Sequence, residues 1–546
     1  MRTVSRRTFL GSVVATGATL TLAFAIPASI HRRRRLDAGR RAGEFAPNLW
    51  IRIDAAGDVR IRVHKCEMGQ GVLTALAMLI ADELEADWSR VGVEQADADF
   101  RFADQNTAGS SSIIDTWVPL RRAGAAARLV LVRAAARSWE VPEAECSARD
   151  GRVIHRPTGR RISFGELVPL ARQIPPPCPE EIRLKSPEDW RLIGKPVGAV
   201  DVSAKVTGRQ VYGLDVRVPG MLYATVVRCP VIGGSPLRID DRAARAVPGV
   251  RGTFALDAVP GSRLPARVAV VAASTWAALE GRRRLLVEWA EGPYAALSSE
   301  TIARLLHGAA SAAPIVARND GDAIGAGALG LEAVHATYEL PYLAHAPMEP
   351  INCTADAGAD AIEIWAPTQF PQRAVEHVSA LTGLQPSAVR LHVVPMGGGF
   401  GRRAYPDFVV EAVQVSWAAG APVQTVWTRE DDMRQDYFRP AGVQRLSAAI
   451  DARGRPTAWL HRLAGPSVNL HVFGKTRPVE ENEIDGAATL PYSIPHVRVE
   501  YRPVDVPVPL GVWRSVAQSQ SVACGETVQL PGLQGLSDQV RRLLPF

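Results

Sequence analysis

The residues with the clearest chemical potential form a glycine loop at Met396–Arg403, with the sequence MGGGFGRR. Glycine has no Cβ, so a run of glycines lets the backbone approach a ligand closely. The backbone N–H groups of a helix that starts just after the loop suit an anion, and Arg402 and Arg403 add positive charge. This pattern indicates a loop for a phosphate-bearing cofactor, and a plain structural turn is the alternative.

The loop does not match the known phosphate-binding patterns. A dinucleotide fingerprint that starts at Gly397 requires a glycine where Arg402 stands. The segment Gly474-Lys475-Thr476 also fails as a P-loop, because Asn469 occupies the position of the upstream glycine. Nicotinamide, flavin and nucleoside triphosphate cofactors therefore lose support.

Two further loops have similar composition. Gly69-Gln70-Gly71 precedes a predicted helix that runs to about Ala86 and has one apolar stripe. The Gln70 amide both donates and accepts hydrogen bonds. Thr107–Ser112 (TAGSSS) is a loop of small residues. A glycine-rich turn with a solvated glutamine and an ordinary polar loop are the respective alternatives.

The surrounding pattern predicts the elements that position these loops. Alternating apolar and charged residues at Leu49–Ile53 and Val59–Val63 predict a hairpin. An extended apolar segment, Val389–Pro395, precedes the MGGGFGRR loop, and a helical pattern, Phe408–Ala419, follows it. A further helix is expected at 121–140.

A proline cluster at Pro175–Pro177 is typical of a linker. After it, Gly194–Pro293 is interpreted as a compact mixed unit, with strands at 211–216, 221–227 and 268–272 and a helix at 274–285. A second link covers about 294–330. In the unit that begins at Leu331, His345 and Glu349 have the spacing of helical metal ligands, but the neighbouring prolines disfavour a helix, so no metal site is predicted.

The net charge of +7 belongs to the N-terminal arm. Residues 1–43 hold nine arginines and one acidic residue, whereas the rest of the chain holds 54 basic and 55 acidic residues. The body of the protein therefore has no electrostatic signature of nucleic-acid binding. Apolar content of 47% and charged content of 22% are those of an ordinary globular protein.

The six cysteines are widely separated, and no two lie within thirty residues of each other. No CxxC or CxxCH motif is present, so the usual spacings for an iron–sulfur cluster or a c-type haem are missing. If the protein is redox-active, its electron carriers are expected elsewhere.

The N-terminus has the pattern of a twin-arginine export signal. Arg6-Arg7 precedes an apolar run, Gly11–Ile30, and a cleavage site is conceivable at Ala23-Phe24-Ala25. Arg32–Arg35, just beyond the run, is an awkward place for positive charge on a translocated segment. We therefore expect a periplasmic protein, and cleavage of the signal or its retention as a membrane anchor both remain open.

The combination of motifs is more specific than any one of them. The motifs include MGQG, TAGSSS, LAHAPMEPINCTA, PTQ, MGGGFGRR, VWTREDD and GVWRSVAQSQS. Together they resemble the molybdenum-binding large subunit of the xanthine dehydrogenase superfamily, in the exported branch typified by isoquinoline 1-oxidoreductase beta subunit and related aldehyde dehydrogenases. The resemblance runs from about 46 to about 522.

The resemblance implies a mixed α+β fold, with molybdopterin-binding domains and an α/β-hammerhead domain. The expected segments are 1–45 for the signal and basic arm, 46–175 for molybdopterin binding, 194–293 for the hammerhead domain, 331–522 for an incomplete molybdopterin-binding domain, and 523–546 for a divergent tail.

The resemblance also assigns residues to a molybdopterin cofactor, expected in its cytosine dinucleotide form. Gln369 would hydrogen-bond an oxygen ligand of molybdenum, and Phe400 and Gly401 would meet the metal centre through backbone N–H groups. Arg514 would lie close to the cofactor. The other residues expected to hold it are Gly69, Gln70, Gly71, Ser110, Ser111, Gly398, Gly399 and Arg402.

The implied chemistry is hydroxylation of an N-heteroaromatic ring or oxidation of an aldehyde, with water as the oxygen source. Electrons would leave through a separate small subunit with two [2Fe–2S] clusters, with a c-type cytochrome as a further acceptor. The alternative is a non-catalytic exported cofactor-binding or assembly protein with the same fold.

Two departures from the family matter. Ala404 stands where xanthine dehydrogenases carry a carboxylate that orients the purine, so purine specificity is not expected. The family's VGE segment, whose glutamate is the general base, is not found, and Glu526 follows the WRS motif too closely to replace it. The sequence thus leads us to expect a truncated or frameshifted member, with a second polypeptide that supplies the rest as the alternative, and no catalytic residue is assigned.

Overall fold

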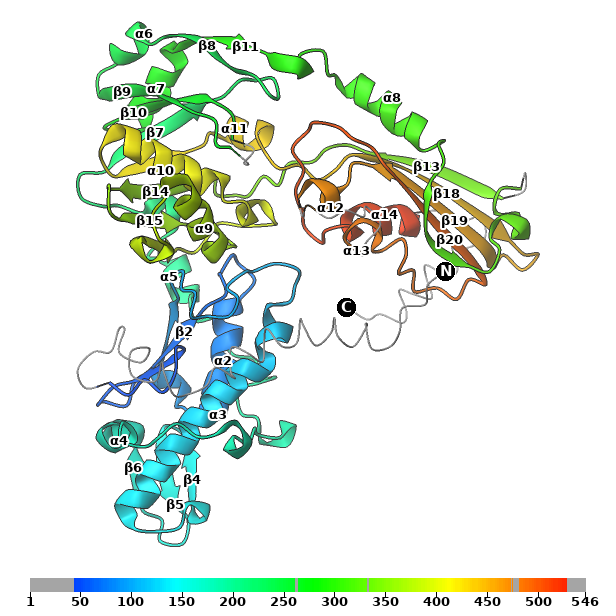
Figure 1. Cartoon of the computed structure of the whole chain (residues 1–546). Helices are drawn as coiled ribbons and strands as arrows, with labels where there is room; N and C mark the ends of the chain where they lie inside the picture. The colour runs from blue at the N-terminus through cyan, green and yellow to red at the C-terminus, as the bar shows by residue number, and fades with distance from the viewer. Residues whose placement is uncertain (1–43, 261–263, 331–332, 473, 475–480, 528–546) are drawn as a thin grey trace. The chain divides into compact units, whose positions relative to one another are not determined.

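The computed structural model (Figure 1) describes the chain except for residues 1–43, 261–263, 331–332, 473, 475–480 and 528–546. The chain divides into two compact units. Unit 1 comprises residues 1–215 and 365–396, and unit 2 comprises residues 216–364 and 397–546. In this division, residues 365–396, which lie within the predicted segment 331–522, group with the N-terminal part of the chain. The predicted export signal lies outside the described residues.

Unit 1 combines short sheets with long helices. Its elements are β1 (Ile51–Ile53), β2 (Val59–Val63), α2 (Val72–Leu84), β3 (Val91–Gln95), α3 (Ser112–Trp139), β4 (Cys146–Arg149), β5 (Arg152–His155), β6 (Arg161–Ser163), α4 (Phe164–Ala171), α5 (Val202–Val206), α9 (Pro371–Thr382) and β16 (Val389–Val393). The predicted hairpin is present as β1 and β2, which pair antiparallel with Ile51 opposite Ile61.

The helices α2 and α3 form the centre of unit 1. Gly124 of α3 lies so close to α2 that a Cβ there would stand 2.4 Å from the carbonyl oxygen of Ile80. The proline-rich region does not act as a free linker. The Asp82 carboxylate of α2 accepts hydrogen bonds from the backbone N–H groups of Leu192 and Ile193, both at 2.8 Å, and so holds the segment that follows the prolines.

The segment 365–396 is bound into unit 1 by hydrogen bonds. The Ala98 N–H donates to the carbonyl of Leu391 in β16 at 2.9 Å. The Gln372 amide, at the start of α9, donates to the carbonyls of Asp99 and Phe102 at 3.2 and 3.1 Å. A strand and a helix that come late in the sequence therefore complete the N-terminal unit.

In its described residues, unit 2 contains two larger sheets and one sheet of two strands. Its elements are β7 (Leu222–Val227), β8 (Ser235–Asp240), α6 (Arg242–Arg245), β9 (Val250–Leu256), β10 (Arg267–Ala272), α7 (Thr275–Arg284), β11 (Leu286–Ala290), α8 (Ser299–Ala309), β12 (Ile315–Asp320), β13 (Val334–Leu340), β14 (Asn352–Ala357), α10 (Asp407–Ala419), β17 (Val423–Val426), α11 (Arg429–Arg434), β18 (Gly442–Ile450), β19 (Pro456–Gly465), α12 (Val468–His471), α13 (Glu481–Ile484), β20 (His496–Pro503) and α14 (Gln518–Thr527). Strand β15 (Ile362–Ala366) spans the boundary between the units in the sequence.

In the first sheet, strands of unit 2 follow the order β14-β17-β7-β10-β9. Every residue of β10 is buried, as expected for an apolar run covered on both faces. Val270 packs under α7, where Gly281 leaves room for it, and Val271 packs with Val415 of α10 on the other face. The strand predicted at 211–216 is wrong, because this segment forms a 3₁₀ turn at Gly213–Asp215.

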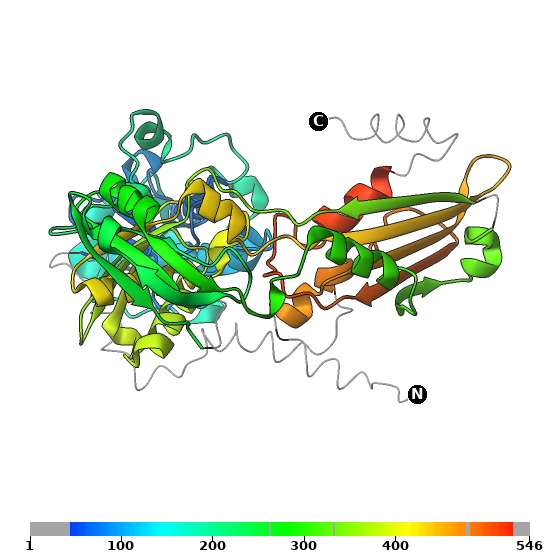
Figure 2. The ribbon, with the colours of Figure 1, turned by 90° about the horizontal axis from the view of Figure 1, so that it is seen from above.

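The second sheet has the order β12-β20-β19-β18-β13. Successive side chains of a strand point to opposite faces of the sheet. Val443 of β18 therefore packs with Leu306 of α8 on one face. Leu446 of the same strand packs on the other face with Ile484 of α13 and Cys524 of α14. Figure 2 shows α8 and α14 against these strands. The mixed α/β class predicted from the sequence is confirmed.

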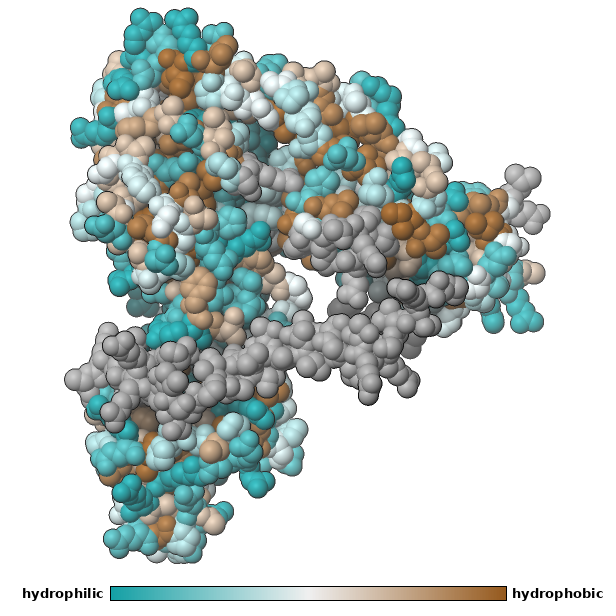
Figure 3. All heavy atoms as spheres, in the orientation of Figure 1, coloured by the Kyte–Doolittle hydropathy of each residue, from teal (hydrophilic) through white to brown (hydrophobic). Residues whose placement is uncertain are grey.

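Polar and charged residues cover much of the face shown in Figure 3, with smaller apolar areas between them. Within the described parts of the chain, no helix is both long and apolar enough to cross a membrane.

Candidate cofactor-binding loops

The Gly69-Gln70-Gly71 loop already holds an anion, the carboxylate of Glu67. The N–H groups of Gly69 and Gly71 donate to Glu67 Oε1 at 2.8 and 3.1 Å, and the N–H of Leu73 donates to Oε2 at 3.0 Å. Glu67 is buried, so it satisfies the free donors at the start of α2 inside the protein. The sequence analysis missed this role, although the acidic residue stands directly before the motif.

Gln70 uses both sides of its amide, as predicted, but within its own loop. Its Oε1 accepts from the Met68 N–H at 2.8 Å, and its Nε2 donates to the Cys66 carbonyl at 2.9 Å. Gly69 and Gly71 have φ values of 99° and 80°, and a Cβ at either position would meet no atom within 4 Å. The exposed backbone of this loop therefore leaves space for a ligand.

Gln369 joins the other predicted loop of unit 1. Its Nε2 donates to the Thr107 carbonyl at 2.8 Å, and its own carbonyl accepts from the Thr107 N–H at 3.0 Å. The Thr107 hydroxyl oxygen accepts from the Cys66 N–H at 2.8 Å. Three segments far apart in the sequence thus meet in unit 1. The predicted hydrogen bond from buried Gln369 to an oxygen ligand of molybdenum stays a prediction.

Ser110 and Ser111 lie on the turn that leads into α3. Ser110 is exposed and has a left-handed backbone with φ of 57°. Gly109 before it has φ of 61° and open space where a Cβ would stand. The Ser111 N–H donates to the Ala108 carbonyl at 3.3 Å. This turn presents a small-residue backbone at the surface, which fits a cofactor with many oxygen atoms.

The glycines of the MGGGFGRR loop, in unit 2, are needed for a different reason than the glycines of the unit 1 loops. A Cβ on Gly397 would lie 2.5 Å from the Glu349 Cβ, and one on Gly398 would lie 2.7 Å from the Phe400 ring. A Cβ on Gly401 would lie 2.0 Å from the Val512 carbonyl oxygen. Contacts within the protein already require glycine at these positions, and their role towards a ligand stays a prediction.

The two arginines of the loop are fully buried and paired. Arg402 makes a bidentate pair with Asp407, at 2.9 and 2.8 Å, and Arg403 donates to the carbonyl and the carboxylate of Glu349 at 2.8 and 3.2 Å. Burial lowers the pKa of Arg402, but Asp407 outweighs burial and the net shift is upward. Both guanidiniums thus pair with carboxylates of the protein, Asp407 is the first residue of α10, and the role of Arg402 towards a cofactor stays a prediction.

Phe400 and Arg514, two residues that the resemblance assigns to the cofactor, contact each other. The Arg514 N–H donates to the Phe400 carbonyl at 2.9 Å, and the Arg514 guanidinium carbon stands 4.7 Å from the centre of the Phe400 ring. Phe400 keeps 36% of its surface exposed. A cation and an aromatic ring thus share one exposed position beside Gly401.

His345 and Glu349 do not face a common point. The His345 ring contacts Asp436 and the Val512 carbonyl, whereas Glu349 accepts from the Gly397 N–H at 2.8 Å. In the part of the chain that the structure describes, no three His, Cys, Asp or Glu side chains are grouped so as to hold a metal ion.

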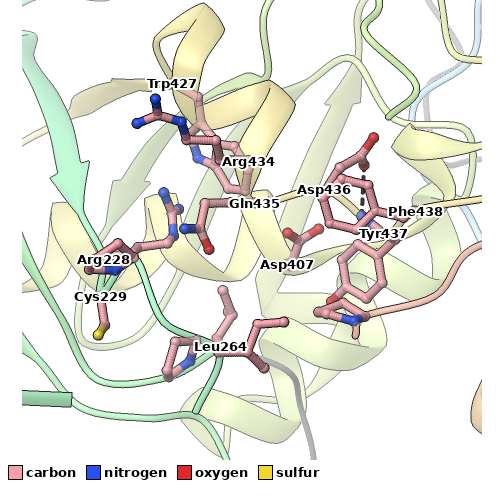
Figure 4. Close-up of a pocket in the computed structure, with 14 residues that line it drawn as sticks. Arg228, Cys229, Leu264, Asp407, Trp427, Arg434, Gln435, Asp436, Tyr437 and Phe438 are labelled. Carbon is pink, nitrogen blue, oxygen red and sulfur yellow. Dashed lines mark hydrogen bonds between the residues drawn. The ribbon is translucent and has the colours of Figure 1, made fainter. Parts of the chain in front are cut away.

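A pocket of about 80 Å³ lies beside the Arg402 network (Figure 4). Asp407, Asp436 and Tyr437 lie on one side, and Arg228 and Trp427 on the other. Its lining is Arg228, Cys229, Pro230, Ile232, Leu264, Pro265, Asp407, Trp427, Arg434, Gln435, Asp436, Tyr437, Phe438 and Pro509. The pocket is small and its acids are paired, so it fits water better than an organic substrate.

One carboxyl group near the loop is strongly perturbed. Burial raises the pKa of Asp432, in α11, to about 6, although Arg429 pairs with it. Burial likewise raises the pKa of Glu483 to about 7, where it accepts from the Ser467 hydroxyl at 2.8 Å. Both groups change charge near neutral pH.

The comparisons with known proteins match domains whose ranges include these loops. Two models of the molybdopterin cofactor-binding domain match residues 23–208 and 311–528. The chain is 34% identical to isoquinoline 1-oxidoreductase subunit beta of Brevundimonas diminuta, over 86% of this chain and 65% of that protein. It is also 34% identical to membrane-bound aldehyde dehydrogenase [pyrroloquinoline-quinone] of Gluconacetobacter polyoxogenes, over 84% of this chain and 60% of that protein.

Among solved structures, quinoline 2-oxidoreductase from Pseudomonas putida 86 is 20% identical, with a TM-score of 0.49 over 63% of this chain and 49% of that one.

The chain therefore has the molybdopterin cofactor-binding domains of the xanthine oxidase family. The predicted resemblance is confirmed. The chain spans about 60 to 65% of the length of these two curated relatives.

Proposed function

We propose that this chain is a molybdenum hydroxylase large subunit that oxidises an N-heteroaromatic compound or an aldehyde with water as the oxygen source. The observation that carries the proposal is the match of two molybdopterin cofactor-binding domains to the segments that hold the three small-residue loops. The names of the two relatives, an isoquinoline oxidoreductase subunit and an aldehyde dehydrogenase, supply the substrate classes.

The loops of unit 1 fit such a cofactor. Gly69, Gly71 and Gly109 have left-handed backbones, and their Cα atoms face open space. Exposed Gln70 and Ser110 stand beside them. A pterin with a pyrophosphate and a second nucleotide, the cytosine dinucleotide form, has the many oxygen atoms that neutral amides, hydroxyls and backbone N–H groups bind.

When bound, the cofactor would supply a molybdenum centre for two-electron oxidation and transfer of oxygen from water. The chain would hold and orient it. The loops of unit 1 would bind the pterin and the phosphates, and in unit 2 the backbone of Phe400 and Gly401 would be kept rigid by its neighbours. The Arg514 guanidinium, fixed over the Phe400 ring, would favour negative charge on nearby atoms.

The electrons would pass to a separate [2Fe–2S] subunit, with a c-type cytochrome as a further acceptor. The cysteine spacing supports a separate carrier, because it suits neither a cluster nor a c-type haem in this chain. Arg6-Arg7 and the apolar run after them support export by the twin-arginine route to the periplasm, with the N-terminus as a membrane attachment if it is retained.

Coexpression of the chain with the [2Fe–2S] subunit of a related molybdenum hydroxylase tests the proposal. The purified complex is analysed for molybdenum, for cytidine monophosphate released by acid, and for oxidation of isoquinoline and benzaldehyde with an artificial electron acceptor. We expect the metal and the nucleotide in equal amounts and oxidation of one substrate class. A folded complex without molybdenum, prepared in a host that loads a related enzyme, contradicts the proposal.

A second candidate is cofactor binding without turnover. Four carboxylates beside the described loops, Glu67, Glu349, Asp407 and Asp436, accept hydrogen bonds from protein N–H groups, so none of these four is placed as a general base. Molybdenum and nucleotide in the complex, with no oxidation of either substrate class and no Mo(V) signal on incubation with substrate, support this candidate.

A further inference from the structure

His345 stands out in unit 2 because both of its ring nitrogens contact hydrogen-bond acceptors. The side chain is fully buried, with Nδ1 2.9 Å from Asp436 Oδ2 and Nε2 2.9 Å from the Val512 carbonyl oxygen. The backbone N–H of His345 donates to the same carboxylate at 2.5 Å. The residue therefore connects three segments of unit 2, and the proposed function assigns it no role.

The partners define the protonation of the ring. A neutral imidazole has one N–H and one bare nitrogen, so it satisfies only one of two acceptors. Asp436 is held as a carboxylate, because its Oδ1 accepts from the Tyr437 N–H at 2.7 Å and lies 2.9 Å from Arg402 Nε. Asp407, the second acid of this network, forms a bidentate ion pair with Arg402. Two donors on His345 satisfy both of its contacts, and they make the ring a cation.

The contacts of His345 lie where two loops meet. A Cβ on Gly401 would be 2.0 Å from the Val512 oxygen and 3.2 Å from His345 Nε2, so the glycine backbone lies against both. The Val512 N–H donates to the Tyr405 hydroxyl at 2.8 Å, which binds the same loop from its other side. Two residues further on, Arg514 binds the Phe400 carbonyl.

These loops hold conformations that need support. Phe400 and Ser515 both have φ of 56°, and Ala346, directly after the histidine, has φ of 44°. A left-handed backbone at a residue other than glycine is strained and persists only where its surroundings enforce it. Strain of this kind gathers at sites whose geometry matters.

We propose that His345 is a positioning residue, a doubly protonated imidazolium that clamps the Val512–Ser515 loop onto the Phe400-Gly401 turn through Asp436. The clamp fixes the distance between the Phe400 carbonyl and Arg514, the two groups that the proposed function places at the cofactor. The protonation and the clamping rest on contacts within unit 2 alone, whereas the link to the cofactor rests on the proposed function.

The protonation is tested by NMR of the full chain labelled with ¹⁵N-histidine. His461 is an internal control, because its Nε2 contacts Gln444 Oε1 at 2.7 Å, its Nδ1 has no partner, and burial lowers its pKa to about 3. We expect two slowly exchanging ring N–H signals from His345 between pH 6 and 8 and one from His461. A single ring N–H on His345 overturns the proposal.

Assignment uses the loss of the signals in His345→Gln. Should that variant not fold, neutron diffraction of the unaltered protein locates the ring hydrogens directly, and the same criterion applies.

The clamping is tested with a pair of variants. The amide of His345→Asn can reach the position of Nδ1 and keeps the Asp436 contact, whereas that of His345→Gln reaches the position of Nε2 and keeps the Val512 contact. We expect hydrogen exchange at the amides of Val512 and Arg514 to rise at least tenfold in both variants. Exchange there should be unchanged in His461→Asn, a matched buried histidine.

Unchanged exchange in both His345 variants contradicts the clamp. In the molybdenum-loaded complex, we expect a lower kcat with little change in KM. Absence of activity in the unaltered complex would contradict the proposed catalytic function but not the clamp. The NMR and hydrogen-exchange results that test the clamp do not depend on turnover.

Discussion

The two glycine loops of this protein use the same residue for opposite reasons. In unit 1, Gly69 and Gly71 face open space, and the N–H groups of their loop turn inward to the Glu67 carboxylate. In unit 2, Gly397 and Gly401 are pressed against backbone and side chains of their own unit. The comparison teaches that a glycine motif identifies a site, but only the neighbours of each glycine show whether a ligand or the protein requires it.

The sharpest test of this contrast is Gly401→Ala. A methyl group there would overlap the Val512 carbonyl, and φ of 107° strains any side chain. We expect a loss of about 4 kcal/mol or more in the free energy of unfolding. Urea unfolding followed by circular dichroism measures it. A loss below about 1 kcal/mol would show that the two loops separate easily.

The pH dependence of stability probes the network around the unit 2 loop. Asp432 has a folded-state pKa raised to about 6, so the folded state binds its proton more tightly than the unfolded state. Stability is therefore highest below about pH 4 for this group and falls as pH rises to about 6, by about 3 kcal/mol. Urea titrations from pH 4 to pH 7 should show this decline.

In Asp432→Asn we expect a shallower curve over the same range. The Glu483 carboxyl, with its pKa raised to about 7, acts in the same direction and accounts for the remaining decline. A curve for Asp432→Asn that is parallel to that of the unaltered protein would contradict the assignment.

In unit 1, Glu67→Ala removes the internal anion of the loop. Three N–H groups then lose their acceptor, and water reaches only the exposed part of the loop. We expect a loss of about 2 kcal/mol, with Glu67→Gln in between because its amide keeps one acceptor oxygen. Thermal unfolding measures the loss, and equal Tm values for the three proteins would refute it.

The smallest expected effect is that of Gly71→Ala. The added methyl group meets nothing, so only the backbone strain at φ of 80° counts, about 1 kcal/mol. Gly454→Ala is a matched control, with φ of 77° and equally open space in a turn of unit 2. Similar stability losses, with cofactor content lowered only in Gly71→Ala, would show that a ligand uses the open side.

Much of this architecture was predictable from local patterns. The alternation in Val59–Val63 and the helical pattern of Phe408–Ala419 correspond to β2 and α10 within one residue, because binary patterning determines local structure strongly. The strand expected at Val211–Val216 failed, since its apolar residues fit a turn equally well.

The details of the site depend on long-range contacts. Arg402 and Asp407 are only five residues apart in the sequence, yet the burial that makes their ion pair inaccessible comes from the whole of unit 2. The contact of Gln369 with Thr107 spans 262 residues, and no spacing rule reaches that far. Family resemblance singled out these residues, and the structure shows which of their bonds are already in use.

The order in which the chain is made follows from the way unit 1 is assembled. Its strand β16 and helix α9 are translated only after residues 216–364, which belong to unit 2. At about 5–20 residues per second, the segment 44–215 waits roughly ten to forty seconds on the ribosome before the residues that bind Ala98 and Phe102 exist. The nascent N-terminal part must therefore stay soluble as an incomplete unit, and a chaperone that binds it during this interval would govern the yield of folded protein.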